Sequence, residues 1–143
     1  MSSPIFTRPR FLPASKINGA TIDHAVVSDG CIINYAKIYR SIVGVRSIVN
    51  EGCDINRTVL MGSDYYESEA SIQHYEANRV PRIGIGKNTR IENAIVDKNA
   101  RIGANCVISP EGNPDHLDHA LYYIRDGVVI VPKNGIIPHG TVI

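Results

Sequence analysis

The fold of this chain is decided by residues 83–108, which read IGIGKNTRIENAIVDKNARIGANCVI. Within this stretch an aliphatic residue returns every five or six positions, at Ile85, Ile91, Val96, Ile102 and Ile108. A compact residue lies two positions before each of the last four, namely Thr89, Ala94, Ala100 and Cys106. A period near six matches neither the 3.6-residue period of a helix nor the alternation of a hairpin strand, so the apolar stripe belongs to a longer repeating unit.

The same spacing extends over most of the chain. Its other aliphatic positions are Ile17, Ile22, Val27, Ile33, Ile38, Val43, Val49, Ile55, Leu60, Val131, Ile137 and Ile143. Residues i and i−2 of an extended segment point to the same side, so the aliphatic and the compact residue both enter the interior of a narrow prism. Three such segments close one triangular coil, and coils stack at roughly 4.8 Å. The pattern therefore predicts an all-β protein, a parallel β-helix of hexapeptide repeats with about five or six coils.

Two stretches leave this register and predict loop insertions. Residues 61–82 carry acidic and tyrosine residues, and residues 109–128 carry Pro, Gly, Asp and His. Loops that leave a solenoid project from a corner and often contact partners or ligands. Residues 68–79 within the first insertion predict a short helix. We assign 17–143 to the β-helix domain and 1–16, which has three prolines, to an extended lead-in segment.

Composition narrows the class of protein. The chain has 143 residues, enough for one domain, and no apolar run long enough to cross a membrane. A net charge of +1 with scattered Lys and Arg gives no general footprint for nucleic acid or a lipid surface. The N-terminus shows no signal peptide, and three cysteines without paired spacing are typical of a reducing compartment, so we expect a cytoplasmic protein.

Catalytic and metal-binding motifs are few. The segment Gly84–Thr89 superficially suggests a phosphate loop, but the first glycine of that motif would be Pro81, and the repeat already explains it. Hexapeptide β-helices include zinc carbonic anhydrases and acyltransferases with a loop histidine as base, so His116 and His119 are candidates for both roles. We interpret this pair as solvated loop residues, and we predict no metal, no cofactor and no catalytic residue.

Two lysines occupy equivalent positions in the repeat. Lys98 and Lys133 each lie two residues after an inward valine, and three inward steps, one full coil, separate those valines once 109–128 is looped out. We therefore expect the two side chains at equivalent corners of adjacent coils. Two ammonium groups so placed repel each other unless an anion lies between them. The spacing indicates a phosphate or carboxylate site, and two solvated lysines that point apart remain the alternative.

Five segments carry a resemblance to a known family. They are PIFTRPRFLPASK (4–16), SIVGVRSIVNEGCDI (41–55), TVLMGSDYYESE (58–69), VPRIGIGKNTRIENAIVDKNARIG (80–103) and YYIRDGVVIVPKN (122–134). Together they closely resemble the C-terminal domain of ADP-glucose pyrophosphorylase, or glucose-1-phosphate adenylyltransferase, in its plant and cyanobacterial branch. MGSDYY and IVDKNARIG are specific to that family.

The resemblance implies a left-handed β-helix that regulates and oligomerises an enzyme of glycogen or starch synthesis. In that family catalysis belongs to an N-terminal nucleotidyltransferase domain, whose Gly-rich phosphate loop this sequence lacks, so we expect no enzymatic activity from this chain. Two C-terminal lysines of the family bind an anionic effector such as 3-phosphoglycerate or phosphate, and they match Lys98 and Lys133. Arg10 and Arg8 match the neighbouring segment and are candidate companions. The expected partners are the effector, the catalytic domain and further copies of the chain, in the cytoplasm or, for a plant protein, the plastid stroma.

Two other functions remain open. A hexapeptide acyltransferase would need a coenzyme A groove between coils, with His119 as its base. A purely structural scaffold would need neither.

Overall fold

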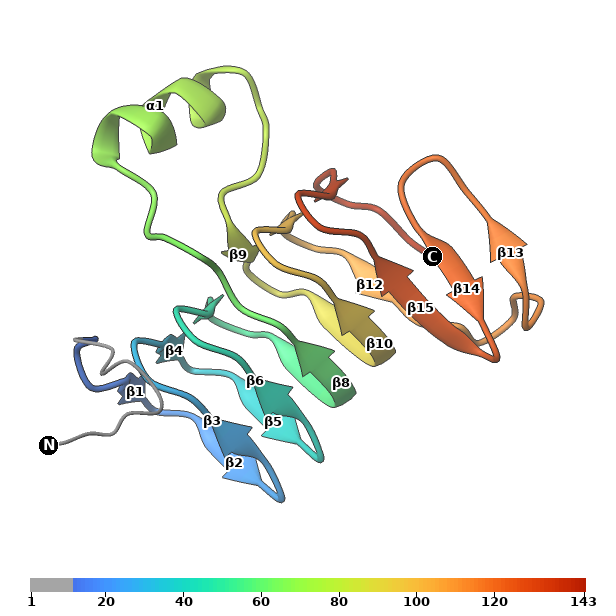
Figure 1. Cartoon of the computed structure of the whole chain (residues 1–143), viewed down its shortest axis with the longest axis horizontal. Coiled ribbons are helices and arrows are strands. Elements are labelled where there is room, and N and C mark those ends of the chain that lie inside the picture. Colours follow the sequence, from blue (N-terminus) through green and yellow to red (C-terminus); the bar gives the residue numbers. More distant parts are fainter. Residues whose placement is uncertain (1–11) are drawn as a thin grey trace, which may run out of the picture.

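A computed structural model describes residues 12–143, which form a stack of three-sided coils with an arm projecting from one corner (Figure 1). The coils have three faces, on which strands of successive coils pair in parallel. The first face runs in the order β1 (Lys16–Asn18), β4 (Ile32–Asn34), β7 (Ile48–Val49), β9 (Gly84–Ile85), β11 (Arg101–Ile102) and β16 (Ile136–Ile137).

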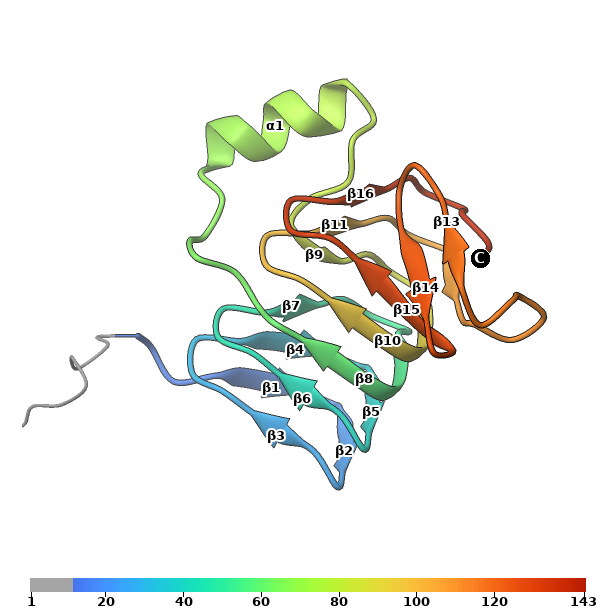
Figure 2. The ribbon, with the colours of Figure 1, turned by 45° about the vertical axis from the view of Figure 1, so that its right-hand side comes forward.

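The second and third faces are joined by two long strands, β8 (Asp54–Leu60) and β10 (Arg90–Val96), which bend around the corner between them. The bends lie at Arg57 and Asn93, both with φ of 49°. The other strands of the second face are β2 (Thr21–Asp23), β5 (Lys37–Tyr39) and β12 (Val107–Ile108). Those of the third face are β3 (Val26–Val27), β6 (Ile42–Val43) and β15 (Val128–Val131), which lies beside β10 in Figure 2.

The register confirms the repeat read from the sequence. Inward residues pair with inward residues along the stack, so that each face contributes one column of aliphatic side chains. The second-face column contains Ile22, Ile38, Ile55, Ile91 and Ile108, of which the last four have no exposed surface. Burying such a side chain contributes on the order of 1.5–3 kcal/mol before chain entropy is subtracted. The columns are less covered at the first coil, where Ile17 is 46% exposed.

The three cysteines lie inside the coils, as the repeat predicts. Cys31, Cys53 and Cys106 are at most 2% exposed, and each thiol donates to a carbonyl oxygen of an adjacent coil. Burial raises the pKa of the Cys31 and Cys53 thiols above the ordinary value for cysteine. Because the thiolate is the reactive form, these two side chains behave as small core residues.

The first insertion forms the arm, which we define as residues 61–82. It contains the predicted helix, α1 (Glu69–Ala77). Ser68 caps the beginning of this helix, because its Oγ accepts a hydrogen bond from the Ser71 amide at 3.1 Å. The helix buries no residue completely and stands away from the coils in Figure 2. It is the only helix in residues 12–143, and it is too short to cross a membrane.

The second insertion differs from the predicted loop. Residues 109–128 contain β13 (Leu117–Asp118) and β14 (Tyr123–Arg125), and β14 pairs antiparallel with β15. Ile124 is completely buried and lies opposite Val129. The physical reason is that β15 ends the third face, and an unpaired edge strand is costly to leave open. This insertion therefore caps one end of the stack.

Candidate anion-binding corner

The two predicted lysines lie at the corner that joins the third face to the first. This corner follows Leu60, Val96 and Val131, which are stacked on successive coils. Lys98 and Lys133 each precede an asparagine with a φ near 60°, a conformation that asparagine tolerates better than most residues. The Asn134 amide donates to the Lys98 carbonyl at 2.9 Å. The sequence prediction that the two lysines occupy equivalent positions on adjacent coils is confirmed.

Asp64 lies between the two lysines. Its Oδ1 is 3.3 Å from Nζ of Lys98, and its Oδ2 is 3.9 Å from Nζ of Lys133. Asn99 makes two hydrogen bonds to Asp64. Its Oδ1 accepts from the backbone amide of Asp64 at 2.9 Å, and its Nδ2 donates to Oδ2 of Asp64 at 3.1 Å. We call Lys98, Lys133, Asp64 and Asn99 the lysine corner. The lysine side chains therefore converge on one carboxylate instead of pointing apart.

The electrostatics of the corner follow from these contacts. The hydrogen bonds from Asn99 and from Lys98, with the positive charges of both lysines, hold the pKa of Asp64 below the ordinary value for aspartate. Asp97 adds a second carboxylate, whose Oδ1 accepts from the Lys98 amide at 2.6 Å. Two lysines and two carboxylates leave the corner with little net charge while Asp64 is in place.

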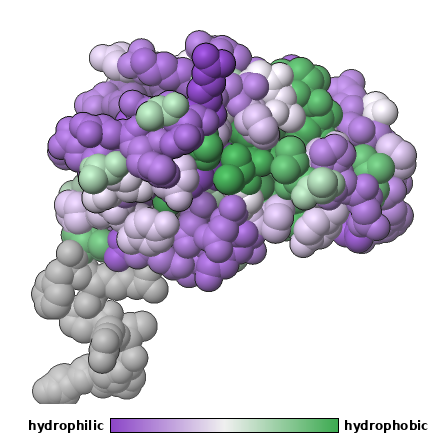
Figure 3. Space-filling model, turned by 90° about the horizontal axis from the view of Figure 1, so that it is seen from above, coloured by the Kyte–Doolittle hydropathy of each residue, from purple (hydrophilic) through white to green (hydrophobic). Residues whose placement is uncertain are grey.

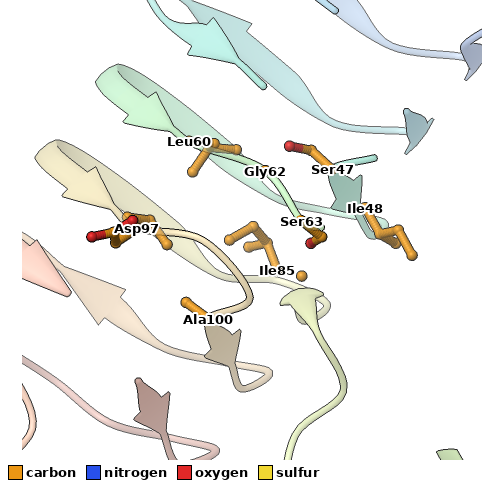
Figure 4. Close-up of a pocket in the computed structure, with 10 residues that line it drawn as sticks. Ser47, Ile48, Leu60, Gly62, Ser63, Ile85, Asp97 and Ala100 are labelled. Carbon is orange, nitrogen blue, oxygen red and sulfur yellow. The ribbon is translucent and has the colours of Figure 1, made fainter. Parts of the chain in front are cut away.

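Only the outer side of the corner has room for a ligand. The interior pocket beneath it, lined among others by Leu60, Ile85 and Asp97, has a volume of about 20 Å³ (Figure 4). That volume has room for about one water molecule, so it excludes a phosphate ester. On the outer side the side chains of Lys98, Lys133 and Asp64 are 40%, 56% and 45% exposed and are open to solvent.

Sequence reasoning missed Asp64, although the register contains the signal. Leu60 lies three inward steps before Val96, one full coil, so the segment after Leu60 passes directly below Lys98. The Asn99 amide donates to the Gly62 carbonyl at 3.1 Å, which places the root of the arm there. The predicted companions Arg8 and Arg10 lie outside the described residues.

A buried ion pair fixes the arm close to this corner. Nη1 of Arg101 is 2.9 Å from Oε2 of Glu67 and donates to the Pro81 carbonyl at 3.1 Å. The guanidinium also lies 3.9 Å from the ring centre of Tyr75 in α1. Glu67 in turn accepts a hydrogen bond from the Ile83 amide at 2.6 Å. Arg101 thus contacts the beginning, the helix and the end of the arm.

The beginning of the arm also contacts the coils, since the Tyr66 hydroxyl donates to the Gly30 carbonyl at 2.8 Å and Nη1 of Arg46 donates to the Ser63 carbonyl at 3.2 Å. The returning segment packs less closely. A cavity of about 360 Å³ separates this segment from the coil corners, with Val80, Pro81 and Ile102 among its walls. Seen from above, a hydrophobic band runs between more hydrophilic regions of the surface (Figure 3). The helix and the returning segment of the arm therefore depend strongly on the contacts of Arg101 with Tyr75 and Pro81.

The loop histidines have local partners. The His119 ring stacks on Tyr122 with ring centres 4.5 Å apart, and its Nδ1 accepts from the Leu121 amide at 3.1 Å. His116 lies 3.4 Å from the carboxylate of Asp126. Within residues 12–143 no three His, Cys, Asp or Glu side chains gather as metal ligands would. Each of the two histidines therefore has a contact within its own insertion.

The three columns and the positive-φ corners define a hexapeptide parallel β-helix. A family model described as the GLGC left-handed parallel beta-helix domain matches residues 10–142. This chain therefore belongs to that family, which also supplies the left hand of the coil.

One relative makes the likeness more specific. The chain is 47% identical over 148 residues to the chloroplastic/amyloplastic small subunit of glucose-1-phosphate adenylyltransferase from Triticum aestivum. That alignment covers 99% of this chain but 30% of the wheat protein. The chain thus spans less than a third of the length of this relative.

Proposed function

We propose that this chain is the regulatory and oligomerisation β-helix of an ADP-glucose pyrophosphorylase, and that its lysine corner is part of an anionic effector site. The observation that carries the proposal is the convergence of Lys98 and Lys133 on one carboxylate, at 3.3 and 3.9 Å. A corner that holds an aspartate in this way offers the same donors to a phosphate ester or a carboxylate. The family match supports the assignment.

The remaining parts of the proposal concern the whole enzyme. We expect the effector to be a phosphate ester such as 3-phosphoglycerate, or phosphate itself, with Arg10 and Arg8 as further contacts. The 143 residues alone should not form ADP-glucose, because they carry no recognisable nucleotidyltransferase motif. A nucleotidyltransferase domain would be the catalytic partner. The compartment would be the cytoplasm or the plastid stroma.

The test is a titration of the chain with inorganic phosphate and with 3-phosphoglycerate, followed by NMR so that weak binding is detected. Lys98→Ala and Lys133→Ala should each weaken binding about tenfold, since each removes one charge-assisted hydrogen bond. The matched control is Lys87→Ala, because Lys87 precedes Asn88 in the same kind of turn but on another corner. Equal binding by all three variants would refute the site, and so would an absence of binding in the unaltered chain.

Oligomerisation is proposed from the open end of the stack. The first coil exposes the inward residue Ile17, at 46%, beside strands with one unpaired edge. Such an edge favours association with another copy. Sedimentation should show a dimer or larger species, and Ile17→Lys should shift it toward monomer. A monomer at every concentration would count against this part of the proposal.

A further inference from the structure

We propose that Asp64 is an internal competitor for the lysine corner, so that an anionic ligand binds Lys98 and Lys133 only by displacing the Asp64 carboxylate. The inference rests on the proposed anion site and adds how that site is regulated. It concerns a residue of the arm, not a residue of the corner strands, and so it connects ligand binding to the arm.

The geometry makes the two occupants mutually exclusive. Asp64 uses both of its oxygens on the lysines, one for each Nζ. A phosphate or carboxylate placed between the two ammonium groups would occupy the same space and meet a like charge at contact distance. The cavity beneath the corner is too small to accept either group instead. Binding is therefore an exchange of one anion for another.

Tethering favours Asp64 in that exchange. Asp64 is held in the chain three residues before Glu67, whose carboxylate is anchored to Arg101 at 2.9 Å. A tethered group competes at a high effective concentration, and this lowers the apparent affinity for every free anion. By the same linkage, a ligand that displaces Asp64 removes one of the contacts that hold the root of the arm, and loosening that root strengthens ligand binding.

The test compares Asp64→Asn with the unaltered chain, using inorganic phosphate and acetate as separate probes. Exposed ion pairs are individually weak, so losing the two pairs should raise affinity about fivefold to tenfold. If Asp64 competes with the ligand, the affinity for phosphate and the affinity for acetate should rise by the same factor, because the substitution removes the same competitor in both cases. Asp23→Asn is the control, since it removes one negative charge from β2 at the far end of the stack and should change affinity less than twofold.

A second readout follows Asp64 itself. In the unaltered chain, phosphate should move the carboxyl ¹³C resonance of Asp64 toward that of a free aspartate, and exchange of its amide, which donates to Asn99, should accelerate. A larger gain for phosphate than for acetate would indicate that Asp64 repels the ligand but stays in place, and would overturn displacement. Unchanged affinity in Asp64→Asn, with binding still lost in Lys98→Ala, would refute the competitor and leave the proposed function intact. No binding in any variant would refute both.

Discussion

Ile91→Asp should abolish folding of the chain. Ile91 is completely buried at the middle of the second-face column, in register with Ile55 on one side and Ile108 on the other. An ionised carboxylate there would lose its hydration without gaining a partner, and a protonated one would still replace the packing of Ile91 with an unpaired polar group. Such losses are large for a domain whose fold is stable by only about 5–15 kcal/mol. Circular dichroism should show no cooperative thermal transition.

Two further variants separate burial from the choice of residue. Ile91→Ala should keep the fold but lower the free energy of unfolding by about 2–5 kcal/mol, the usual cost of a buried cavity. Ile42→Asp places the same charge on a position of the third face that points outward and is 49% exposed, and it should cost no more than about 0.5 kcal/mol. A cooperative transition in Ile91→Asp close to that of the unaltered chain would contradict the column.

Arg101→Ala should detach the arm while the coils remain folded. The Arg101 and Glu67 side chains are 9% and 5% exposed, so removing the arginine leaves a buried carboxylate without its partner. Breaking such a pair costs about 3–5 kcal/mol, and α1, with nine residues, is too short to persist without tertiary contacts. Hydrogen exchange should show loss of protection in Glu69–Ala77, with the amides of β8 and β10 still protected.

The double variant identifies the cause of that loss. Replacing both members of the pair, as Glu67→Leu with Arg101→Leu, removes the unpaired charge and should cost less than either single leucine substitution. If Arg101→Ala leaves the exchange of α1 unchanged, the ion pair does not hold the arm. If the double variant is the most damaged, the specific hydrogen bonds to Pro81 and Ile83 carry the stabilisation instead.

The sequence predicted the features that depend on the period. Counting inward positions placed Val96 and Val131 on adjacent coils, and this alone brought Lys98 and Lys133 to one corner. A solenoid is nearly one-dimensional, so a local repeat determines contacts between residues far apart in the chain. The helix in the arm was also predicted, because its apolar spacing is local.

The two insertions were harder to predict because tertiary contacts decide their paths. Pairing of β14 with β15 depends on an open strand edge at the end of the stack, which no spacing within 109–128 encodes. The Glu67–Arg101 pair joins residues 34 positions apart across the break in the period. Asp64 is the exception, since the position of Leu60 contained enough information to place it below Lys98.

The central claim is that stacking of adjacent coils builds one anion site from Lys98 and Lys133. A crystal structure of the chain grown with phosphate tests it most directly. The account predicts a phosphate within hydrogen-bonding distance of Nζ of both lysines, with the Asp64 carboxylate turned away from them. A phosphate bound to neither lysine, or the two lysines on separate faces of the coil, would contradict the account.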